Sequence, residues 1–511
     1  MKRGVVFLAV ACALLAALAQ PSSLAPLASL AGPIRAESGT LQQPAKTSDV
    51  NARVTRIENG LLPAVLIQGR PVPAMTIAER MRHYNVPGVS IAFFGEGRIL
   101  WTRTYGLADL AGKKPVTIET LFQAASISKP VSALAALKLV QEGKLNLDED
   151  VNVKLHTWKV PENGFTKDQK VTLRRILSHS AGLTVHGFPG YGSDEPVPTI
   201  VQILNGEKPA NTPPIRVDTV PGTIWRYSGG GYVVMQTLLT DVTGEPYPQI
   251  VHKLVLQHAG MTHSTYEQPL PKEFSSSAAT PYRSSGEPVK GGWHTYPEMA
   301  PAGLWTTPSD LALLAIEVQK EYAGKSSKIL SQPMMRQMLT RQKDNWGLGF
   351  GLEDPGHAAS FGHGGANEGF RCNLQAYTDS QSDEGVAMMT NSDAGGQLMS
   401  EIIRAVAREY HWPDFQPLER KVVTVAPKVF DGYAGRYQLE PDFILTFTRE
   451  GDHFFTQATG QPRDEIFPSS DLDFFLTAVD AQVTFVTDSQ GRATEVILHQ
   501  GGEDHHAKRI E

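Results

Sequence analysis

The sequence predicts an α/β (α+β) protein in which a large mixed body is followed by a second, small all-β domain. Three observations lead to this expectation. Residues 72–409 mix short apolar runs, typical of strands, with stretches of helical periodicity. The tail from about residue 430 repeats a hairpin pattern. The composition, 41% hydrophobic and 20% charged over 511 residues, is that of a globular protein with a sizeable core.

The elements of the body are marked by their turns and caps. Residues 89–94 and 99–101 are apolar and flank a Gly-Glu-Gly-Arg turn, which predicts a β-hairpin. Residues 130–142 have helical periodicity and end at Gly143, a natural helix C-cap. A further helix is expected over residues 311–322, with Ser309 or Asp310 near its N-terminus.

The tail contains two more hairpin patterns. Residues 443–447 and 453–456 flank a Glu-Gly-Asp turn, and residues 483–486 and 496–498 flank a turn that contains Gly491. Repeated hairpins in so short a segment predict a small antiparallel barrel or sandwich.

The N-terminus resembles an export signal. Lys2 and Arg3 precede an apolar run too short to span a bilayer comfortably, which predicts a secretory signal peptide over residues 1–19. An uncleaved membrane anchor is the alternative. The predicted domains are then a flexible leader over 20–50, the main body over 51–412, a linker over 413–428 and the β-domain over 429–511. We expect an exported protein, periplasmic or secreted, with no membrane contact after cleavage.

Composition and motif searches exclude several classes of function. A formal net charge of −6 lacks the basic footprint of a nucleic-acid binder. Two cysteines, Cys12 and Cys372, cannot form a disulfide framework or a four-cysteine zinc site. No His-Glu-x-x-His motif occurs, and Gly229-Gly230-Gly231 lacks the Gly-Lys-Ser/Thr of a phosphate loop. We therefore expect no metal and no organic cofactor.

The chemistry is concentrated around Ser126-Ile127-Ser128-Lys129, directly before the predicted helix. If Ser126 opens that helix, Lys129 lies one turn later on the same face. A lysine amine whose pKa is depressed can accept the proton of a serine and make it a nucleophile. Taken alone, the pattern is also that of an N-capping serine with a solvated lysine.

Two further stretches support a catalytic interpretation. Residues 225–232 read Trp-Arg-Tyr-Ser-Gly-Gly-Gly-Tyr, and residues 361–370 read Phe-Gly-His-Gly-Gly-Ala-Asn-Glu-Gly-Phe. Each could be a glycine turn with a packed aromatic ring or a surface histidine. The order and separation of the three stretches indicate one active site. His179-Ser180-Ala181-Gly182 is no nucleophile elbow, because Ser178 stands where that motif has glycine.

Together these motifs resemble the serine β-lactamase and penicillin-binding-protein superfamily, in particular its class C-like branch with family VIII carboxylesterases and D-aminopeptidases. Ser126 and Lys129 match its Ser-x-x-Lys motif. Tyr227-Ser228-Gly229 matches Tyr-x-Asn in part, and His363-Gly364-Gly365 matches the His-x-Gly of the esterase-like members. The resemblance implies a β-lactamase/transpeptidase-like fold, a mainly antiparallel sheet flanked by helices plus a helical region. Residues 433–437 and the hairpins after them resemble an appended lipocalin-like barrel.

The resemblance also implies roles for these residues. Ser126 attacks the substrate carbonyl and becomes the acyl-enzyme, while Lys129 and Tyr227 share the proton transfers, with either one as general base. The backbone N–H groups of Ser126 and Ala366 are the expected oxyanion hole. The substrate-binding set comprises His363, Gly364, Gly365 and Gly229, with Phe188 or Tyr191 expected to touch the substrate.

Two departures from the family motifs bear on the substrate. Gly229 replaces the asparagine that contacts the substrate amide in relatives. His363 replaces a permanent cation, which predicts a pH-dependent grip on a substrate carboxylate. Both changes favour neutral short-chain or aryl esters, so the leading prediction is a carboxylesterase that acts on a small molecule as a monomer or homo-oligomer. A D-amino-acid-specific peptidase, a β-lactam hydrolase and a non-catalytic sensor acylated at the same serine are the alternatives.

Overall fold

A computed structural model describes residues 47–353, 359–378, 383–461 and 463–511 of the chain. The predicted signal peptide and residues 20–46 of the predicted leader lie outside the described residues. The described residues divide into two compact units, one formed by residues 76–403 and the other by residues 47–75 together with 404–511. None of the described helices combines the length and the apolar character that a membrane span requires.

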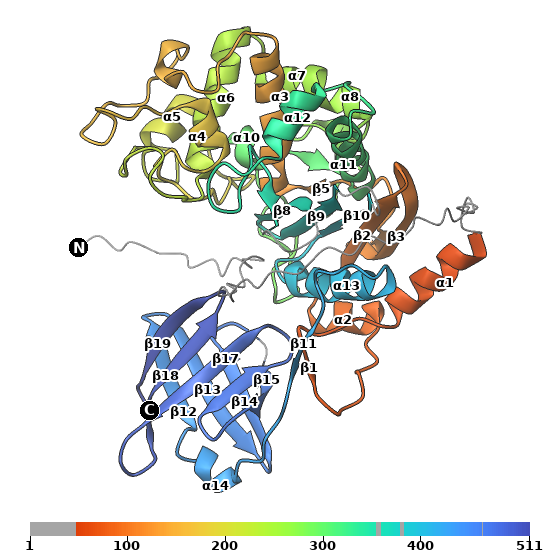
Figure 1. The fold of residues 1–511 in the computed structure, drawn as a ribbon, viewed down its shortest axis with the longest axis vertical. Helices are drawn as coiled ribbons and strands as arrows, with labels where there is room; N and C mark the ends of the chain where they lie inside the picture. The colour runs from red at the N-terminus through yellow and green to blue at the C-terminus, as the bar shows by residue number, and fades with distance from the viewer. Residues whose placement is uncertain (1–46, 354–358, 379–382, 462) are drawn as a thin grey trace, which may run out of the picture. The chain divides into compact units, whose positions relative to one another are not determined.

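An antiparallel sheet forms the centre of the first unit, and seven strands build it in the described part of the chain (Figure 1). The strand order is β4-β3-β2-β10-β9-β8-β7. The predicted hairpin is confirmed, since Phe94 of β2 pairs with Ile99 of β3. A smaller ladder joins β5 to β6. The strands are β2 (Gly88–Gly95), β3 (Arg98–Asp109), β4 (Lys114–Pro115), β5 (Phe122–Gln123), β6 (Trp305–Thr306), β7 (Gly351–Leu352), β8 (Ser360–Asn367), β9 (Phe370–Tyr377) and β10 (Gly385–Thr390).

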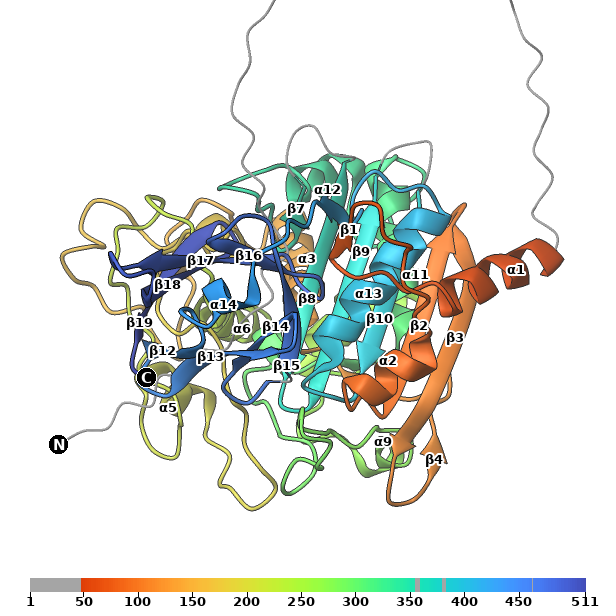
Figure 2. The same cartoon turned by 90° about the horizontal axis from the view of Figure 1, so that it is seen from below.

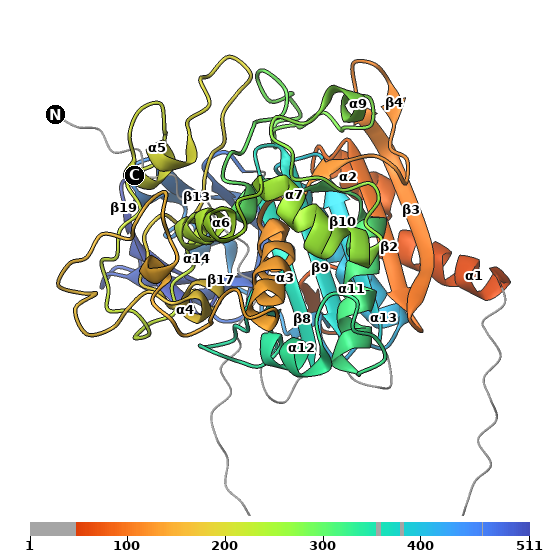
Figure 3. The ribbon, with the colours of Figure 1, turned by 90° about the horizontal axis from the view of Figure 1, so that it is seen from above.

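Helices cover both faces of this sheet. The helices are α2 (Ile77–His83), α3 (Ser128–Gln141), α4 (Leu173–Leu177), α5 (Ile200–Asn205), α6 (Gly229–Thr243), α7 (Tyr247–Val251), α8 (Gln257–Ala259), α9 (Lys272–Ser275), α10 (Met299–Ala302), α11 (Pro308–Tyr322), α12 (Gln332–Met338) and α13 (Gly395–Glu409), with the 3₁₀ turns η1 (Ala125–Ile127) and η2 (Val151–Val153) and the π-helical η3 (His252–Leu256). Helix α2 and the first part of α13 lie on one face (Figure 2), where Arg80 pairs with Glu401. Helix α11 and the helical region lie on the opposite face (Figure 3).

The expected helix before Tyr322 is present as α11, but its cap differs from the prediction. Thr307 is the N-cap, and its hydroxyl accepts a hydrogen bond from the Asp310 N–H at 3.1 Å. Pro308 occupies the first turn, where its missing N–H costs nothing. The predicted caps, Ser309 and Asp310, therefore lie inside the first turn.

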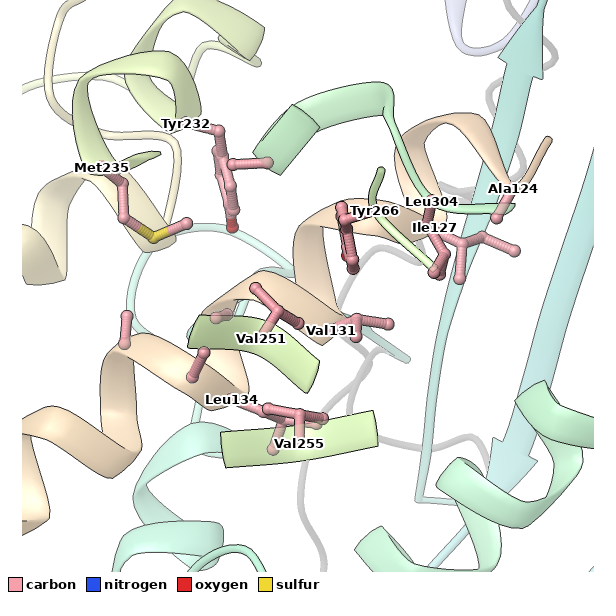
Figure 4. Packing of buried hydrophobic residues seen from close by; sticks show 14 of the residues in the cluster. Ala124, Ile127, Val131, Leu134, Tyr232, Met235, Val251, Val255, Tyr266 and Leu304 are labelled. Carbon is pink, nitrogen blue, oxygen red and sulfur yellow. The ribbon is translucent and has the colours of Figure 1, made fainter. Parts of the chain in front are cut away.

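Helix α3 is the centre of the helical region. Every residue from Ser128 to Leu137 is buried, as expected for a helix that is surrounded by protein on all sides. Tyr232 and Met235 of α6, Val251 of α7 and Val255 of η3 pack around it (Figure 4). This packing buries the start of α3.

The second unit contains a closed antiparallel barrel, built from eight strands in the part of the chain that is described. Each strand pairs with the next and β12 pairs with β19, which confirms the predicted all-β domain as a barrel. Aromatic rings fill its interior, and Phe430 of α14 stacks on Phe454 at 4.3 Å. The elements are α1 (Thr47–Glu58), β1 (Val65–Ile67), β11 (Leu418–Arg420), α14 (Pro427–Phe430), β12 (Gly435–Glu440), β13 (Phe443–Glu450), β14 (His453–Ala458), β15 (Arg463–Pro468), β16 (Asp473–Leu476), β17 (Ala481–Thr487), β18 (Ala493–Gln500) and β19 (Glu503–Arg509).

The division into units differs from the predicted domain boundaries. Residues 51–75 group with the C-terminal unit, because β1 pairs in parallel with β11 inside the predicted linker. Helix α1 begins at Thr47, within the predicted leader. The pairing of β1 with β11 joins segments about 350 residues apart, and a sequence pattern contains no signal for such a contact.

Candidate active site

Ser126 and Lys129 are brought together by the turn that leads into α3. Ser126 lies in η1 and Lys129 in the first turn of α3, so one turn of helix separates them. Lys129 Nζ donates hydrogen bonds to Ser126 Oγ at 2.9 Å and to the carbonyl oxygen of Pro301 at 3.0 Å. Ala125, directly before the serine, has a φ of +48°, a backbone conformation that costs energy for a residue with a side chain. The serine thus stands on a strained turn with an amine beside it.

Burial changes the acidity of the Lys129 amine. The side chain is 2% exposed and lies in the apolar surroundings of α3. Removal from water disfavours the charged form and lowers the pKa of Lys129 to about 7. Near neutral pH a large share of the amine is therefore uncharged, and only an uncharged amine can accept a proton.

Tyr227 lies close to the Lys129 amine. Lys129 Nζ lies 4.8 Å from the centre of the Tyr227 ring, and the Tyr227 hydroxyl is near enough to Ser126 for the serine to lower the pKa of the phenol. Burial raises the pKa of the Tyr227 phenol well above its ordinary value, against the smaller opposing effect of Ser126. The phenol therefore keeps its proton. Burial makes the Lys129 amine able to accept a proton near neutral pH and leaves the Tyr227 phenol unable to do so.

Strand β8 brings His363 and Ala366 to the same place. The strand packs against η1, and the segment from Ser360 to Asn367 pairs with β9. Asn367 and Phe370 close a two-residue hairpin and form a hydrogen-bonded pair, so the neighbouring pair of Ala366 and Arg371 is not hydrogen-bonded. The N–H of Ala366 consequently points away from β9 and is free of the ladder.

His363 is neutral, which corrects the expectation of a pH-dependent cation. Its side chain is 8% exposed, and Nδ1 contacts the carbonyl oxygen of Gly364, an arrangement that places a proton on Nδ1. Burial, and next the charge of Lys129, lower the pKa of the His363 imidazole to about 3. A grip on a carboxylate by imidazolium is therefore absent across the neutral pH range. Nε2 is left as a buried acceptor that has no hydrogen-bond partner among the described residues.

Gly229 and Phe188 are neighbours next to Tyr227. Gly229 is the first residue of α6, and Ser228 caps this helix by accepting a hydrogen bond from the Gly231 N–H. A Cβ atom at position 229 would lie 3.0 Å from the Phe188 ring and 3.0 Å from the carbonyl oxygen of His186. Phe188 thus occupies space next to the position where the family motif has an asparagine side chain.

Tyr191 does not have the predicted place in a substrate pocket. Its side chain is 2% exposed, its hydroxyl donates to Glu298 Oε1 at 3.4 Å, and it accepts from the Asn211 N–H at 3.3 Å. Glu298 is the N-cap residue of α10. Tyr191 therefore supports α10 from the interior and has no exposed surface to offer a substrate.

Several residues of the site escape sequence reasoning. The carbonyl oxygen of Pro301 holds Lys129, and Asn367 Nδ2 donates to Gln123 Oε1 at 2.8 Å, which joins β8 to β5. Any residue type supplies a carbonyl, so Pro301 leaves no signal. The rings of Trp346 and His179 lie 6.1 Å and 4.2 Å from the Tyr227 ring. Both residues lie in further stretches, residues 172–183 and 346–350, that also resemble the family, and this resemblance is the signal that could have found them.

A metal site is not part of this arrangement. Within residues 47–353, 359–378, 383–461 and 463–511, no three His, Cys, Asp or Glu side chains lie close enough together to hold a metal ion. His505 and His506 lie in β19 of the barrel and pair with Glu503 and Glu495.

The fold agrees with the comparison with known families. The sequence model of the family described as Beta-lactamase matches residues 74–410. The chain belongs to the beta-lactamase family. A second model, described as a domain of unknown function (DUF3471), matches residues 419–509, which include the barrel of this beta-lactamase-family chain.

Relatives of this beta-lactamase-family chain include penicillin-binding proteins and an esterase. Penicillin-binding protein 4* of Bacillus subtilis is 25% identical over 81% of this chain and 93% of its own length. Esterase EstB of Burkholderia gladioli is 30% identical over 42% of this chain and 54% of its own length. The octameric penicillin-binding protein homologue from Pyrococcus abyssi has the same fold, with a TM-score of 0.56 and 22% identity over 84% of this chain and 98% of that chain.

The close contact between β8 and the serine turn provides a test of the site's construction. A Cβ atom at Gly365 would lie 2.3 Å from the Ala124 carbonyl oxygen and 2.3 Å from Cys372 Sγ, whereas one at the exposed Gly364 meets nothing closer than 3.9 Å. We expect Gly365→Ala to lower the free energy of unfolding by about 1–3 kcal/mol through overpacking. Gly364→Ala is the matched control and should stay within about 0.5 kcal/mol of wild type. Equal denaturation midpoints for the two variants would contradict the contact.

Proposed function

We propose that this chain is a serine hydrolase that forms an acyl-enzyme on Ser126 and acts preferentially on short-chain or aryl carboxylic esters. The observation that carries the proposal is the 2.9 Å hydrogen bond between Ser126 Oγ and the buried Lys129 amine, whose pKa burial lowers to about 7. A serine becomes a nucleophile when a neighbouring base can take its proton at working pH. Lys129 has both the position and the acidity for this task.

Acylation follows from these positions. Neutral Lys129 takes the Ser126 proton while Oγ attacks the ester carbonyl, and the N–H groups of Ser126 and Ala366 hold the oxyanion. Collapse of the tetrahedral intermediate breaks the bond to the leaving oxygen, which receives the proton from Lys129 through the Tyr227 hydroxyl. The proximity of the Tyr227 hydroxyl to Ser126 supports this relay. We assign the base role to Lys129 because burial keeps the Tyr227 phenol protonated.

Deacylation uses the same groups in the reverse order. A water molecule attacks the acyl carbonyl and gives its proton to Lys129 through Tyr227. The bond between Ser126 Oγ and the acyl carbon then breaks, the acid leaves, and Oγ regains a proton. No step requires a metal or an organic cofactor.

The surroundings of the serine favour neutral esters over anionic lactams. His363 is an uncharged acceptor at neutral pH, so it offers no cation to a substrate carboxylate. Gly229 has no side chain, and the Phe188 ring lies against it, so the amide contact of the family's asparagine is missing. A D-amino-acid-specific peptidase, a β-lactam hydrolase and an acylated sensor without turnover are the alternatives that the experiment below separates.

Export and assembly are further parts of this proposal. Residues 1–19 support a secreted or periplasmic location through their basic and apolar pattern. The relative from Pyrococcus abyssi is octameric. The proposal therefore includes a homo-oligomer. Its substrates are small-molecule esters, amides or lactams, and it has no nucleic-acid or membrane partner.

A substrate panel tests the proposed reaction. We expect kcat/KM for p-nitrophenyl acetate or butyrate to exceed that for a chromogenic cephalosporin and for D-amino-acid anilides. Ser126→Ala should lose turnover of every substrate and keep its melting temperature, because Lys129 retains its hydrogen bond to Pro301. Activity in folded Ser126→Ala would refute the acyl-enzyme. A higher value for the cephalosporin would refute the ester preference, and a burst of one product equivalent without steady state would identify a sensor.

The acidity of Lys129 predicts the pH dependence of acylation. With a pKa near 7, the neutral fraction of the amine rises from about a tenth at pH 6 to about nine tenths at pH 8. For a neutral ester, kcat/KM should therefore rise about tenfold per pH unit below 7 and level off above pH 8. Lys129→Arg, which keeps a charge at every accessible pH, should be inactive across the range. A rising limb centred near pH 10 would assign the base role to another group.

His363 offers an independent check on the base. We expect His363→Ala to lose about 10–10³-fold in kcat/KM, because the substitution removes a polar group beside the serine and leaves Lys129 and Tyr227 in place. The rising limb near pH 7 should remain in the variant, because the pKa of His363 lies far lower, at about 3. If His363→Ala were as inactive as Ser126→Ala, or if the limb vanished, His363 would be the base, as in a Ser-His-Asp triad.

A further inference from the structure

His179 holds the backbone on both sides of Tyr227. Its carbonyl oxygen accepts a hydrogen bond from the Arg226 N–H at 2.8 Å. Its ring nitrogen Nδ1 accepts a hydrogen bond from the Ser228 N–H at 3.1 Å. Arg226 and Ser228 are the residues directly before and after Tyr227, so one histidine holds the backbone N–H groups of both neighbours of this tyrosine.

The ring of His179 also packs on the Tyr227 side chain. The two ring centres lie 4.2 Å apart with 31° between their planes, closer than the other rings that contact Tyr227 in the described chain, which lie 4.9–6.5 Å away. The His179 side chain is 2% exposed, so water does not compete for this contact. Position and orientation of the phenol are thus both set by the same residue.

The protonation state of His179 fits a role in positioning. Because Nδ1 accepts from a backbone N–H, the proton of the neutral ring lies on Nε2. Burial, followed by the charge of Lys129, lowers the pKa of the imidazole, so the ring adds no second cation beside Lys129. It therefore cannot exchange the Ser126 proton through Nδ1.

The backbone of His179 is held in an unusual conformation at this point. Its φ is +55°, in the left-handed region that few residues with side chains adopt. The next residue is fixed on both sides, since the Ser180 N–H donates to the Arg175 carbonyl at 2.8 Å and the Gly222 N–H donates to the Ser180 carbonyl at 2.7 Å. This turn directs the imidazole toward the segment that carries Tyr227.

We propose that His179 is a positioning residue for the reaction at Ser126: it holds the Tyr227 hydroxyl in hydrogen-bonding reach of the serine. The inference rests on the proposed function, since it gives His179 its role through the proton relay of Tyr227. No hydrogen bond in the described chain joins His179 to Ser126, so His179 acts on the reaction through Tyr227.

Two substitutions separate the two contacts of the His179 side chain. His179→Asn keeps an oxygen where Nδ1 lies and tolerates the left-handed backbone, but it lacks the ring. His179→Phe keeps a ring and loses the acceptor for the Ser228 N–H. We expect each variant to lose about 10–100-fold in kcat for p-nitrophenyl acetate, the scale of a displaced catalytic group, with little change in KM.

A double-mutant cycle distinguishes positioning from general structural support. Each His179 variant is combined with Tyr227→Phe, and acylation rates and melting temperatures are measured for all members. If His179 acts through the Tyr227 hydroxyl, the double variants should be no slower than Tyr227→Phe alone. His258→Asn, an exposed histidine on α8, is the control and should match wild type.

The outcomes separate this inference from the proposed function. Losses that multiply in the double variants, or a His179→Asn enzyme as fast as wild type, overturn the inference and leave the role of Ser126 intact. Failure of both His179 variants to fold would assign the residue to stability and also overturn the inference. A fully active Tyr227→Phe enzyme would refute the proton relay of the proposed function, and the positioning role would be refuted with it.

Discussion

The removal of the Lys129 amine from water is the physical constraint on which the site depends. A pKa of about 7 instead of 10.5 corresponds to roughly 5 kcal/mol of disfavoured protonation. Such a shift requires a helix that is buried on all sides, and α3 is buried without interruption from Ser128 to Leu137. Two oxygen atoms, Ser126 Oγ and the Pro301 carbonyl, provide the hydrogen bonds that the buried amine would otherwise lack. The packing of the helical region is therefore part of the chemistry of the serine.

The elements around α3 are linked to one another through buried polar side chains. Asn367 at the end of β8 donates to Gln123 of β5 and to the carbonyl oxygen of Ala302 in α10. The Cys372 thiol donates to the Ala124 carbonyl beneath the serine turn. The first two bonds connect β8, which carries His363, to β5 and to α10, whose Pro301 carbonyl accepts from Lys129. The third bond connects β9 to the turn that carries Ser126. Since each partner is buried, a shift of one element leaves an unpaired polar group, and the geometry is held by that cost.

The sequence predicts the parts of this site that are local and misses those that depend on tertiary contacts. Ser126 and Lys129 are separated by one helical turn, so helical periodicity alone places them together. Tyr227 and His363 were found only through resemblance, because about a hundred residues or more separate each of them from Ser126. The sheet hairpin and the barrel followed from short apolar runs that flank turn residues, whereas the pairing of β1 with β11 had no local signal. Tyr191 was misplaced because an aromatic residue near a pocket in sequence can point into the interior.

Charge around the serine is reduced to a single titratable amine. Three histidines lie near Tyr227, and burial lowers the pKa of each; the buried rings of His179 and His363 are neutral in the pH range where Lys129 changes its charge. A second cation would disfavour the charged form of Lys129, and it would attract anions to the site. Because these rings are neutral, Lys129 becomes positively charged only when it accepts the proton, while the negative charge of the oxyanion develops. The low polarity of the site strengthens the attraction between these two charges. A site built in this way stabilises charge that appears during the reaction and gives little advantage to a substrate that arrives already charged.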